Sequence, residues 1–200
     1  MKPVVSPLQG HWSFFQQFLK HPLQLGSIVP SSRYLEQRIV AQAAAGSAGI
    51  VVELGPGSGG TTRALLTAMA PDARLLSIEL NRDLHALVSR IGDPRLIAHR
   101  GDARDLCETM GQYNLAAPDA VVSGIPFSTM DPGVGRAILA AIAVVLPAGG
   151  RFVAYQVSSR VAELARPILG EPEVALEPLN IPPMRVYCWT RGTGSRASAG

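Results

Sequence analysis

The sequence predicts an α/β fold in which a doubly wound, mostly parallel sheet of seven strands ends in an antiparallel strand. Three observations indicate it. From residue 50 onward, short apolar segments rich in β-branched residues alternate with helical patterns, as in parallel strand–helix units. A glycine cluster follows the first of these segments. The last two strand candidates, residues 173–177 and 184–190, have only Pro-Leu-Asn-Ile-Pro-Pro between them, which is too short for a crossover and predicts a hairpin.

The other elements follow from the same patterns. The five parallel strands are expected at residues 50–54, 74–79, 96–98, 119–123 and 151–157. Helices are expected at residues 61–70, 84–91 and 133–146, and Gly149-Gly150 closes the last of them. An earlier helix is expected through residues 35–40, with Ser31 or Ser32 as its N-cap.

Composition limits the class of protein. Of 200 residues, 47% are hydrophobic and 16% charged, which is too apolar for a disordered chain. No run of about 18 uncharged apolar residues is present to span a bilayer. Cys107 and Cys188 lack the paired spacing of metal sites or disulfide frameworks, so we expect no metal and a reducing, cytoplasmic location. We expect residues 1–48 to form amphipathic helices ahead of the core, residues 49–191 to form the core, and residues 192–200 to be a disordered tail.

The net charge of +3 lies wholly in residues 1–49, which carry four basic side chains and one acidic one. The remaining 151 residues carry 14 of each sign, so no broad basic face for nucleic acid is expected. Residues 11–20 would form an amphipathic helix with an aromatic face. We expect contact with an anionic membrane through Lys2, Trp12, Phe14, Phe15, Phe18, Leu19 and Lys20. The alternative is a helix docked on the protein's own core.

The glycine cluster stands in Val51-Val-Glu-Leu-Gly-Pro-Gly-Ser-Gly59. Glycine permits a tight turn there and lets a ligand reach the main chain, although a purely structural turn would look the same. Acidic side chains mark the ends of the first three predicted strands: Glu53, Glu79 and Asp102. Since doubly wound sheets bind ligands at the carboxyl ends of their strands, these acids predict a binding site.

This pattern resembles the class I S-adenosylmethionine-dependent methyltransferases, which have a Rossmann-like sheet. The resemblance implies that S-adenosylmethionine donates the methyl group and leaves as S-adenosylhomocysteine, without a metal. It implies that Glu53 faces the cofactor's amino group, Glu79 binds both ribose hydroxyls and Asp102 faces the adenine amine. The other cofactor-binding residues that it implies are Gly55, Pro56, Gly57, Ser58, Gly59, Leu80, Gly101, Ala103 and Ser123.

A nicotinamide-binding Rossmann fold is the alternative for this loop. Gly60 completes the glycine spacing that such folds use. Pro56 inside the loop, Glu53 before it and the terminal hairpin favour the methyltransferase.

The fourth strand leads into Ser123-Gly-Ile-Pro-Phe127. This segment resembles the Asn-Leu/Pro-Pro-Phe/Tyr motif of amino methyltransferases such as the rRNA adenine dimethylases. The resemblance implies that Ser123 and Pro126 orient the accepting nitrogen and that Phe127 stacks on the acceptor. Ser123 replaces the motif's Asn, and two residues separate it from Pro126; a turn with a core aromatic is the alternative. These departures, and the lack of a small helical RNA-binding domain after the last strand, argue against base methylation.

The segments Gly26-Ser-Ile-Val-Pro-Ser-Ser32, the glycine loop and Val122–Phe127 together resemble the bacterial, rhizobial-type phospholipid N-methyltransferases, over residues 10–191. The resemblance implies methylation of phosphatidylethanolamine and its methylated intermediates towards phosphatidylcholine. It implies a monomer bound peripherally to the inner membrane and N-terminal helices that cap the substrate. The implied substrate-binding residues are Ser31, Ser32, Tyr34, Ile125, Phe127 and Arg185.

Tyr34 is also the expected hydrogen-bonding and gating group in catalysis, beside Ser123 and Pro126, and Arg185 could equally be a surface arginine. Two other functions stay open. One is methylation of an rRNA adenine, a protein or a small-molecule amine, and the other is a non-catalytic methyltransferase-like binding protein.

Overall fold

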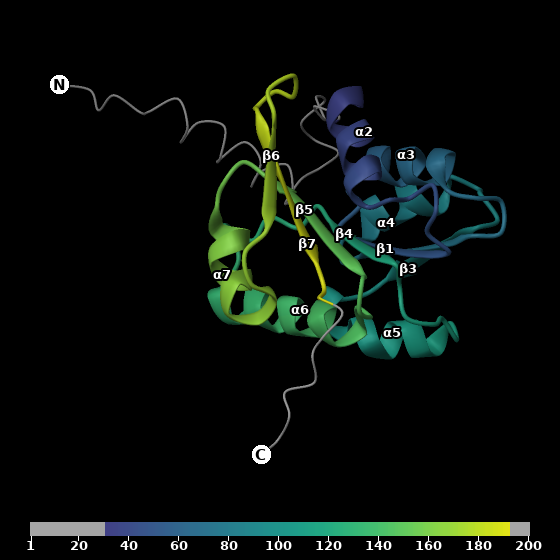
Figure 1. Ribbon diagram of the computed structural model, residues 1–200. Coiled ribbons are helices and arrows are strands. Elements are labelled where there is room, and N and C mark those ends of the chain that lie inside the picture. The colour runs from purple at the N-terminus through teal and green to yellow at the C-terminus, as the bar shows by residue number, and fades with distance from the viewer. Residues whose placement is uncertain (1–30, 193–200) are drawn as a thin grey trace, which may run out of the picture. The chain divides into compact units, whose positions relative to one another are not determined.

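The computed structural model describes residues 31–192, and a seven-stranded sheet forms their centre (Figure 1). The strand order is β3-β2-β1-β4-β5-β7-β6. The strands are β1 (Ile50–Leu54), β2 (Arg74–Glu79), β3 (Leu96–Arg100), β4 (Ala120–Ser123), β5 (Arg151–Gln156), β6 (Glu173–Glu177) and β7 (Met184–Thr190). Strands β1 to β5 run parallel, and β7 pairs antiparallel with both β5 and β6. The predicted doubly wound sheet with an antiparallel last strand is confirmed.

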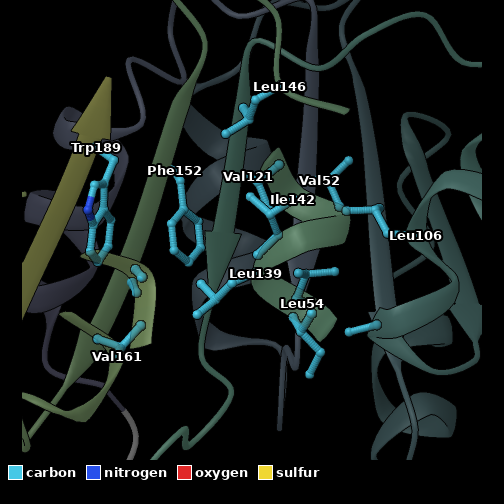
Figure 2. Close-up of a cluster of buried hydrophobic side chains, with 14 of the residues drawn as sticks. Val52, Leu54, Leu106, Val121, Leu139, Ile142, Leu146, Phe152, Val161 and Trp189 are labelled. Atoms are coloured by element: carbon cyan, nitrogen blue, oxygen red, sulfur yellow. The ribbon is translucent and has the colours of Figure 1, made fainter. Parts of the chain in front are cut away.

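Helices cover both faces of the sheet (Figure 1). They are α2 (Arg33–Gln42), α3 (Gly60–Ala68), α4 (Arg82–Ser89), α5 (Leu106–Gln112), α6 (Pro132–Val145) and α7 (Arg160–Leu169), with a 3-10 turn η1 (Ala103–Asp105). One apolar core lies between the sheet and α5, α6 and α7, where Leu139 and Ile142 meet Val121 and Phe152 (Figure 2). A second core lies beneath α2 and α3 on the other face. The sheet is thus buried on both sides, as parallel sheets require.

Local signals explain most helix boundaries. Ser32 is the N-cap of α2, as one of the two predicted candidates, and its hydroxyl accepts from the Leu35 amide at 3.2 Å. Asn81 caps α4 and Asp131 caps α6 in the same way. Helix α3 ends at Ala68, two residues before the predicted end, because Met69 adopts an extended backbone with ψ of 150°.

Helices α5 and α7 were not expected from the sequence. Helix α5 has seven residues and a glycine inside it, so its apolar periodicity is short. Helix α7 contains Pro167, a residue that usually ends a helix. Its apolar face, with Val161, Leu164 and Ala165 buried, stabilises it against α6.

The turn of the β6–β7 hairpin, residues 178–183, lies at the carboxyl edge of the sheet, where doubly wound folds bind their ligands. Gln156, the last residue of β5, is opposite Arg185 near the start of β7. Because β5 runs parallel to β1 and β4, the turn lies beyond the carboxyl ends of these strands. Asn180 fastens the turn to α2, since its side-chain oxygen accepts from the Ser32 amide at 2.8 Å.

Some sequence predictions concern parts of the chain outside the described residues. The predicted membrane helix, with Lys2, Trp12, Phe14, Phe15, Phe18, Leu19 and Lys20, is among them, as is residue 193 onward of the predicted tail. Within residues 31–192, no helix is long and apolar enough to cross a membrane.

Candidate functional site

The glycine loop joins β1 to α3 at the carboxyl edge of the sheet. Gly55, Gly57 and Gly59 have φ values of 71°, 59° and 84°, a left-handed conformation that glycine adopts without strain. A Cβ at Gly57 would have nothing within 4 Å. The backbone at Gly57 therefore faces open space, as a loop that a ligand approaches closely must.

Glu53 lies fully buried below this loop. Its Oε2 accepts hydrogen bonds from the hydroxyls of Thr62, at 2.7 Å, and Ser77, at 2.9 Å. Its Oε1 is buried and has no partner among the described residues. Burial raises the pKa of Glu53 to about 7, and the two hydroxyl donors offset part of that rise. An unpaired carboxylate oxygen in such a place fits a cationic group, such as the amino group of a bound methionine.

Glu79 ends β2 and connects it to the loop. Its Oε2 accepts from the Gly57 amide at 3.3 Å, and its Oε1 accepts from the Asn81 amide at 2.9 Å. Burial is the main cause of the raised pKa of Glu79. Each carboxylate oxygen has a second lone pair, so Glu79 can still accept hydrogen bonds from a pair of ribose hydroxyls.

Asp102 follows β3 and is already paired. Its Oδ1 accepts from the Arg104 amide at 2.8 Å and its Oδ2 from the Arg104 guanidinium at 2.7 Å, which lowers the pKa of Asp102. Leu80 is 69% exposed, whereas Ala103 is buried. A Cβ at Gly101 would lie 2.5 Å from the His99 ring, so a larger residue there would require the imidazole to move. Leu80 and Asp102 follow the neighbouring strands β2 and β3, and an exposed leucine at this edge suits a wall against a flat base.

The predicted acceptor segment leaves the end of β4. Ser123 is buried, and its hydroxyl accepts from the Ile125 amide at 3.3 Å. The Ile125 carbonyl accepts from the Gln156 amide group, and the Pro126 carbonyl accepts from both the amide and the hydroxyl of Thr129 at 3.0 Å. The segment is therefore a hydrogen-bonded turn that is fixed to the end of β5.

The structure corrects the prediction for Phe127. Its side chain is only 1% exposed and belongs to the core beneath α6. In this position it cannot stack on an acceptor, and the alternative of a turn with a core aromatic is the one observed.

The remaining predicted substrate residues lie around the start of α2 and the hairpin. Tyr34 is 40% exposed, and its hydroxyl accepts from the Arg33 guanidinium at 2.8 Å. Arg185 is exposed and donates to the Val157 carbonyl at 2.6 Å. Ser31 precedes the cap Ser32 and is half-buried.

Tyr155 and Glu36 are two site residues that sequence reasoning missed. The Tyr155 hydroxyl is 3.3 Å from that of Thr61, at hydrogen-bonding distance. A Cβ at Gly124 would overlap this hydroxyl and would lie 2.8 Å from the Gly55 carbonyl oxygen. Burial, and then the nearby Glu53 carboxylate, raise the pKa of Tyr155, so the hydroxyl stays protonated.

Glu36 lies on α2. Its Oε1 is 2.8 Å from the point that a Cβ would occupy at Gly60, the first residue of α3. Burial raises the pKa of this carboxyl. The tyrosine follows the apolar residues 152–154 of β5, and only its place near the strand's carboxyl end could have indicated it. Glu36 carried no signal beyond being acidic in a first helical turn.

No group of three metal-binding side chains is present in the described part of the chain. The site thus consists of a glycine loop with acidic side chains at the ends of three parallel strands and a turn after β4. Its residues fit an adenosine-containing cation, because a buried carboxylate oxygen is left without a donor and glycines leave the backbone accessible.

Comparison with known proteins agrees with this chemistry. No family model matches the chain. Ornithine lipid N-methyltransferase from Singulisphaera acidiphila is 29% identical over 189 residues, which is 90% of this chain and 95% of that protein. Ribosomal RNA small subunit methyltransferase A from Laribacter hongkongensis is 34% identical over half of this chain and 36% of its own length.

Solved structures share the fold. The O-methyltransferase TomG from Streptomyces achromogenes, in complex with S-adenosylmethionine, has a TM-score of 0.66 at 16% identity over 88% of this chain and 87% of its own. The N-methyltransferase NodS from Bradyrhizobium japonicum has a TM-score of 0.65 at 14% identity over 80% of this chain and 96% of its own.

Proposed function

Because this chain is a class I S-adenosylmethionine-dependent methyltransferase, we propose that it methylates the amine of a membrane lipid. The specific reaction that we propose is stepwise methylation of phosphatidylethanolamine towards phosphatidylcholine. The observation that carries the lipid assignment is the similarity to a lipid N-methyltransferase over nearly the full length of both chains. The rRNA methyltransferases match only about half of this chain or less.

The methyl donor needs to be held more than it needs to be activated. S-adenosylmethionine carries its methyl group on a positively charged sulfur, so the neutral thioether, S-adenosylhomocysteine, is already a good leaving group when the methyl carbon is attacked. Glu53 Oε1 would accept from the donor's ammonium group, and Glu79 would accept from the ribose hydroxyls. Asp102 and Leu80 would bind the adenine by its amine and one face. The glycine loop would contact the methionine part through its backbone.

The chain's task at the acceptor is alignment and exclusion of water. A primary alkylamine has a pKa of about 10, so the lipid amine must lose its proton before it attacks the methyl carbon. A neighbouring sulfonium disfavours the charged amine and so favours that loss. We assign the position of the nitrogen to the turn after β4, where Ser123, Ile125 and Pro126 lie at the carboxyl edge of the sheet beside Tyr155.

Methylation of rRNA adenine is the second candidate, and the ribosomal relatives favour it. The charge distribution opposes it, since residues 50–200 carry 14 basic and 14 acidic side chains. An enzyme that binds a polyanionic substrate usually presents an excess of basic side chains. The lipid function, by contrast, needs only a local anionic-surface contact, which we propose for a monomer on the cytoplasmic face of the inner membrane.

One assay separates these functions. Purified protein is incubated with methyl-labelled S-adenosylmethionine and one of three acceptors: vesicles containing phosphatidylethanolamine, vesicles containing an ornithine lipid, or small-subunit ribosomal RNA. We expect label in mono-, di- and trimethylated phosphatidylethanolamine. Label in the ornithine lipid alone would correct the substrate and keep the lipid class, whereas label in RNA alone would reject the proposal. Glu79→Ala, with weakened donor binding, serves as the control and should incorporate less label at a limiting donor concentration.

A further inference from the structure

We infer that the β6–β7 hairpin is a membrane-docking surface that seats the open edge of the sheet on an anionic bilayer. The surface consists of an apolar hairpin patch, defined as Val174, Leu176, Leu179 and Ile181, and two flanking arginines, Arg33 and Arg185. The inference rests on the proposed function in one respect, namely that the acceptor lipid lies in that bilayer. The docking surface itself can be tested without any methylation.

The apolar hairpin patch is unusually exposed. The exposed fractions are 55% for Val174, 57% for Leu176, 59% for Leu179 and 75% for Ile181. Nine large hydrophobic residues of the described chain are exposed, and four of them fall in these eight consecutive positions. Single exposed apolar residues are ordinary, but a group of them in one place marks an interaction surface.

The patch is located on the side of the molecule where the site opens. The turn between β6 and β7 lies beyond the carboxyl ends of β1, β4 and β5, because Gln156 is opposite Arg185 in the β5–β7 ladder. The glycine loop and the turn after Ser123 leave the sheet at this same edge. Figure 1 shows the hairpin, in yellow, projecting past the sheet near α2. A bilayer on the patch would thus face the edge that binds the donor.

Hydrogen bonds keep the patch exposed. Glu177 Oε1 accepts from the Leu179 amide at 3.0 Å, while its Oε2 binds the Arg38 guanidinium at 2.9 Å. Asn180 accepts from the Ser32 amide and donates to the Pro182 carbonyl, both at 2.8 Å. Both polar side chains are buried, at 3% and 6% exposed. Since the polar residues of the turn point inward and are paired, the apolar ones cannot fold inward to replace them.

Charge favours an anionic lipid surface as the occupant. Arg185 is opposite Leu176 in the β6–β7 ladder, and Arg33 begins the helix to which the turn is fastened. Neither guanidinium forms a salt bridge with a carboxylate of residues 31–192. Apolar side chains that enter the headgroup region, with arginines beside them, are the combination by which proteins bind anionic bilayers.

The test compares full-length variants in flotation with vesicles of phosphatidylglycerol and phosphatidylcholine. Leu179→Ser combined with Ile181→Ser should lower the vesicle partition coefficient about tenfold or more, since two large side chains lose their apolar burial. Val144→Ser is the matched control, because Val144 is 72% exposed on α6 and outside the patch; its binding should stay within about twofold of the wild type. Unchanged binding of the double variant would overturn the inference.

A second variant separates a loss of vesicle binding from a loss of folding. Ile181→Asp leaves the paired residues of the turn intact and should weaken binding to anionic vesicles at least as strongly, with an unchanged melting temperature. Arg33→Gln with Arg185→Gln should lower binding at low salt and reduce its salt dependence. If the serine pair instead dissociates a dimer and leaves vesicle binding unchanged, a second copy of the chain covers the patch and the inference is wrong.

Failure of the proposed function and failure of the docking surface give different results in methylation assays. The serine pair should lose methylation of vesicle phosphatidylethanolamine but keep that of a short-chain, detergent-dispersed form. If the wild type methylates neither form while the serine pair still loses vesicle binding, the lipid substrate is wrong and the docking surface stands. If the serine pair loses both lipid activities equally and binds vesicles normally, the patch acts on the substrate directly and the docking inference is wrong.

Discussion

The Thr62 hydroxyl donates to Oε2 of Glu53 at 2.7 Å, and both side chains are fully buried. Ser77 donates to the same oxygen, so the two donors hold one side of the carboxylate and leave Oε1 without a partner among the described residues. The helix after the glycine loop thereby fixes the acid at the end of β1. Because burial outweighs these donors, the pKa of Glu53 rises to about 7. Protonation of Glu53 near neutral pH can therefore be used to test the site.

The first prediction concerns stability and pH. Glu53 binds its proton more strongly in the folded protein, with a pKa of about 7, than in the unfolded chain, where a glutamate has a pKa of about 4.3. The contribution of Glu53 to folding stability should therefore fall as the pH rises from about 4.3 to about 7. Glu53→Gln removes this effect, so it should unfold at a higher temperature than the wild type at pH 8 and at a similar one at pH 4.5. Thermal unfolding across this range would contradict the prediction if both proteins showed the same pH dependence.

The second prediction links the same proton to the donor. If the cofactor's ammonium group binds Glu53, it lowers the pKa of this carboxyl, and binding near pH 6.5 should release part of a proton. Affinity for S-adenosylmethionine should then rise with pH up to about 7. Calorimetry in two buffers of different ionisation enthalpy measures the release, which should vanish in Glu53→Gln. Equal release in the variant would place the cation elsewhere.

The third prediction concerns the ribose site. Glu79→Ala should weaken S-adenosylmethionine binding by about 1 to 3 kcal/mol, because the ribose hydroxyls lose a charged acceptor and the Gly57 amide loses its partner. Glu108→Ala, an exposed acid on α5, is the control. Calorimetry that finds equal affinities for the two variants would remove Glu79 from the site.

The fold was predictable because its signals are local. Strands β1 and β2 are short apolar runs, and the six-residue connection before β7 requires a hairpin. Phe127 shows where such reasoning stops, since an aromatic after Ser-Gly-Ile-Pro reads equally as a stacking residue or a core residue. Its burial depends on α6, a helix that no local pattern places above it.

The site was predictable only where the chain order sets the position. Glu53 and Glu79 end parallel strands, so topology alone brings them together. Tyr155 and Glu36 reach the loop from β5 and α2, across long stretches of sequence. The Glu36 contact arises from how α2 packs over α3, and the Tyr155 contact with the turn after β4 arises from the pairing of β5 with β4. Apolar periodicity does not specify which polar side chain such packing turns towards the loop.

The fourth prediction concerns the adenine. Asp102 already binds the Arg104 guanidinium, so the adenine amine must share a paired carboxylate. Asp102→Ala should therefore reduce discrimination between S-adenosylmethionine and an analogue without the adenine amine, with only a small change in affinity for the analogue. Competition binding measures the ratio of the two affinities. An unchanged ratio would show that Asp102 serves to cap η1 and has no role in recognition.

The last prediction concerns Gly124, where the turn after β4 passes close to the glycine loop. A Cβ there would overlap the Tyr155 hydroxyl and press on the Gly55 carbonyl oxygen at 2.8 Å. Gly124→Ala should therefore move the glycine loop and lower S-adenosylmethionine affinity about tenfold, a loss of about 1.4 kcal/mol. Gly111→Ala, with open space in α5, is the control and should be stabilising by about 0.5 to 1 kcal/mol.

Tyr155→Phe decides how the strain at Gly124 is transmitted. Removing the hydroxyl relieves the shortest of the overlaps, so Gly124→Ala combined with Tyr155→Phe should recover part of the lost affinity. The part not recovered comes from the Gly55 carbonyl oxygen and from the ring carbon Cζ of residue 155, which phenylalanine keeps at 3.0 Å from the added Cβ. If the double variant binds no better than Gly124→Ala alone, Tyr155 moves aside without cost. Its hydroxyl then does not support the loop, and its contact with Thr61 is incidental to donor binding.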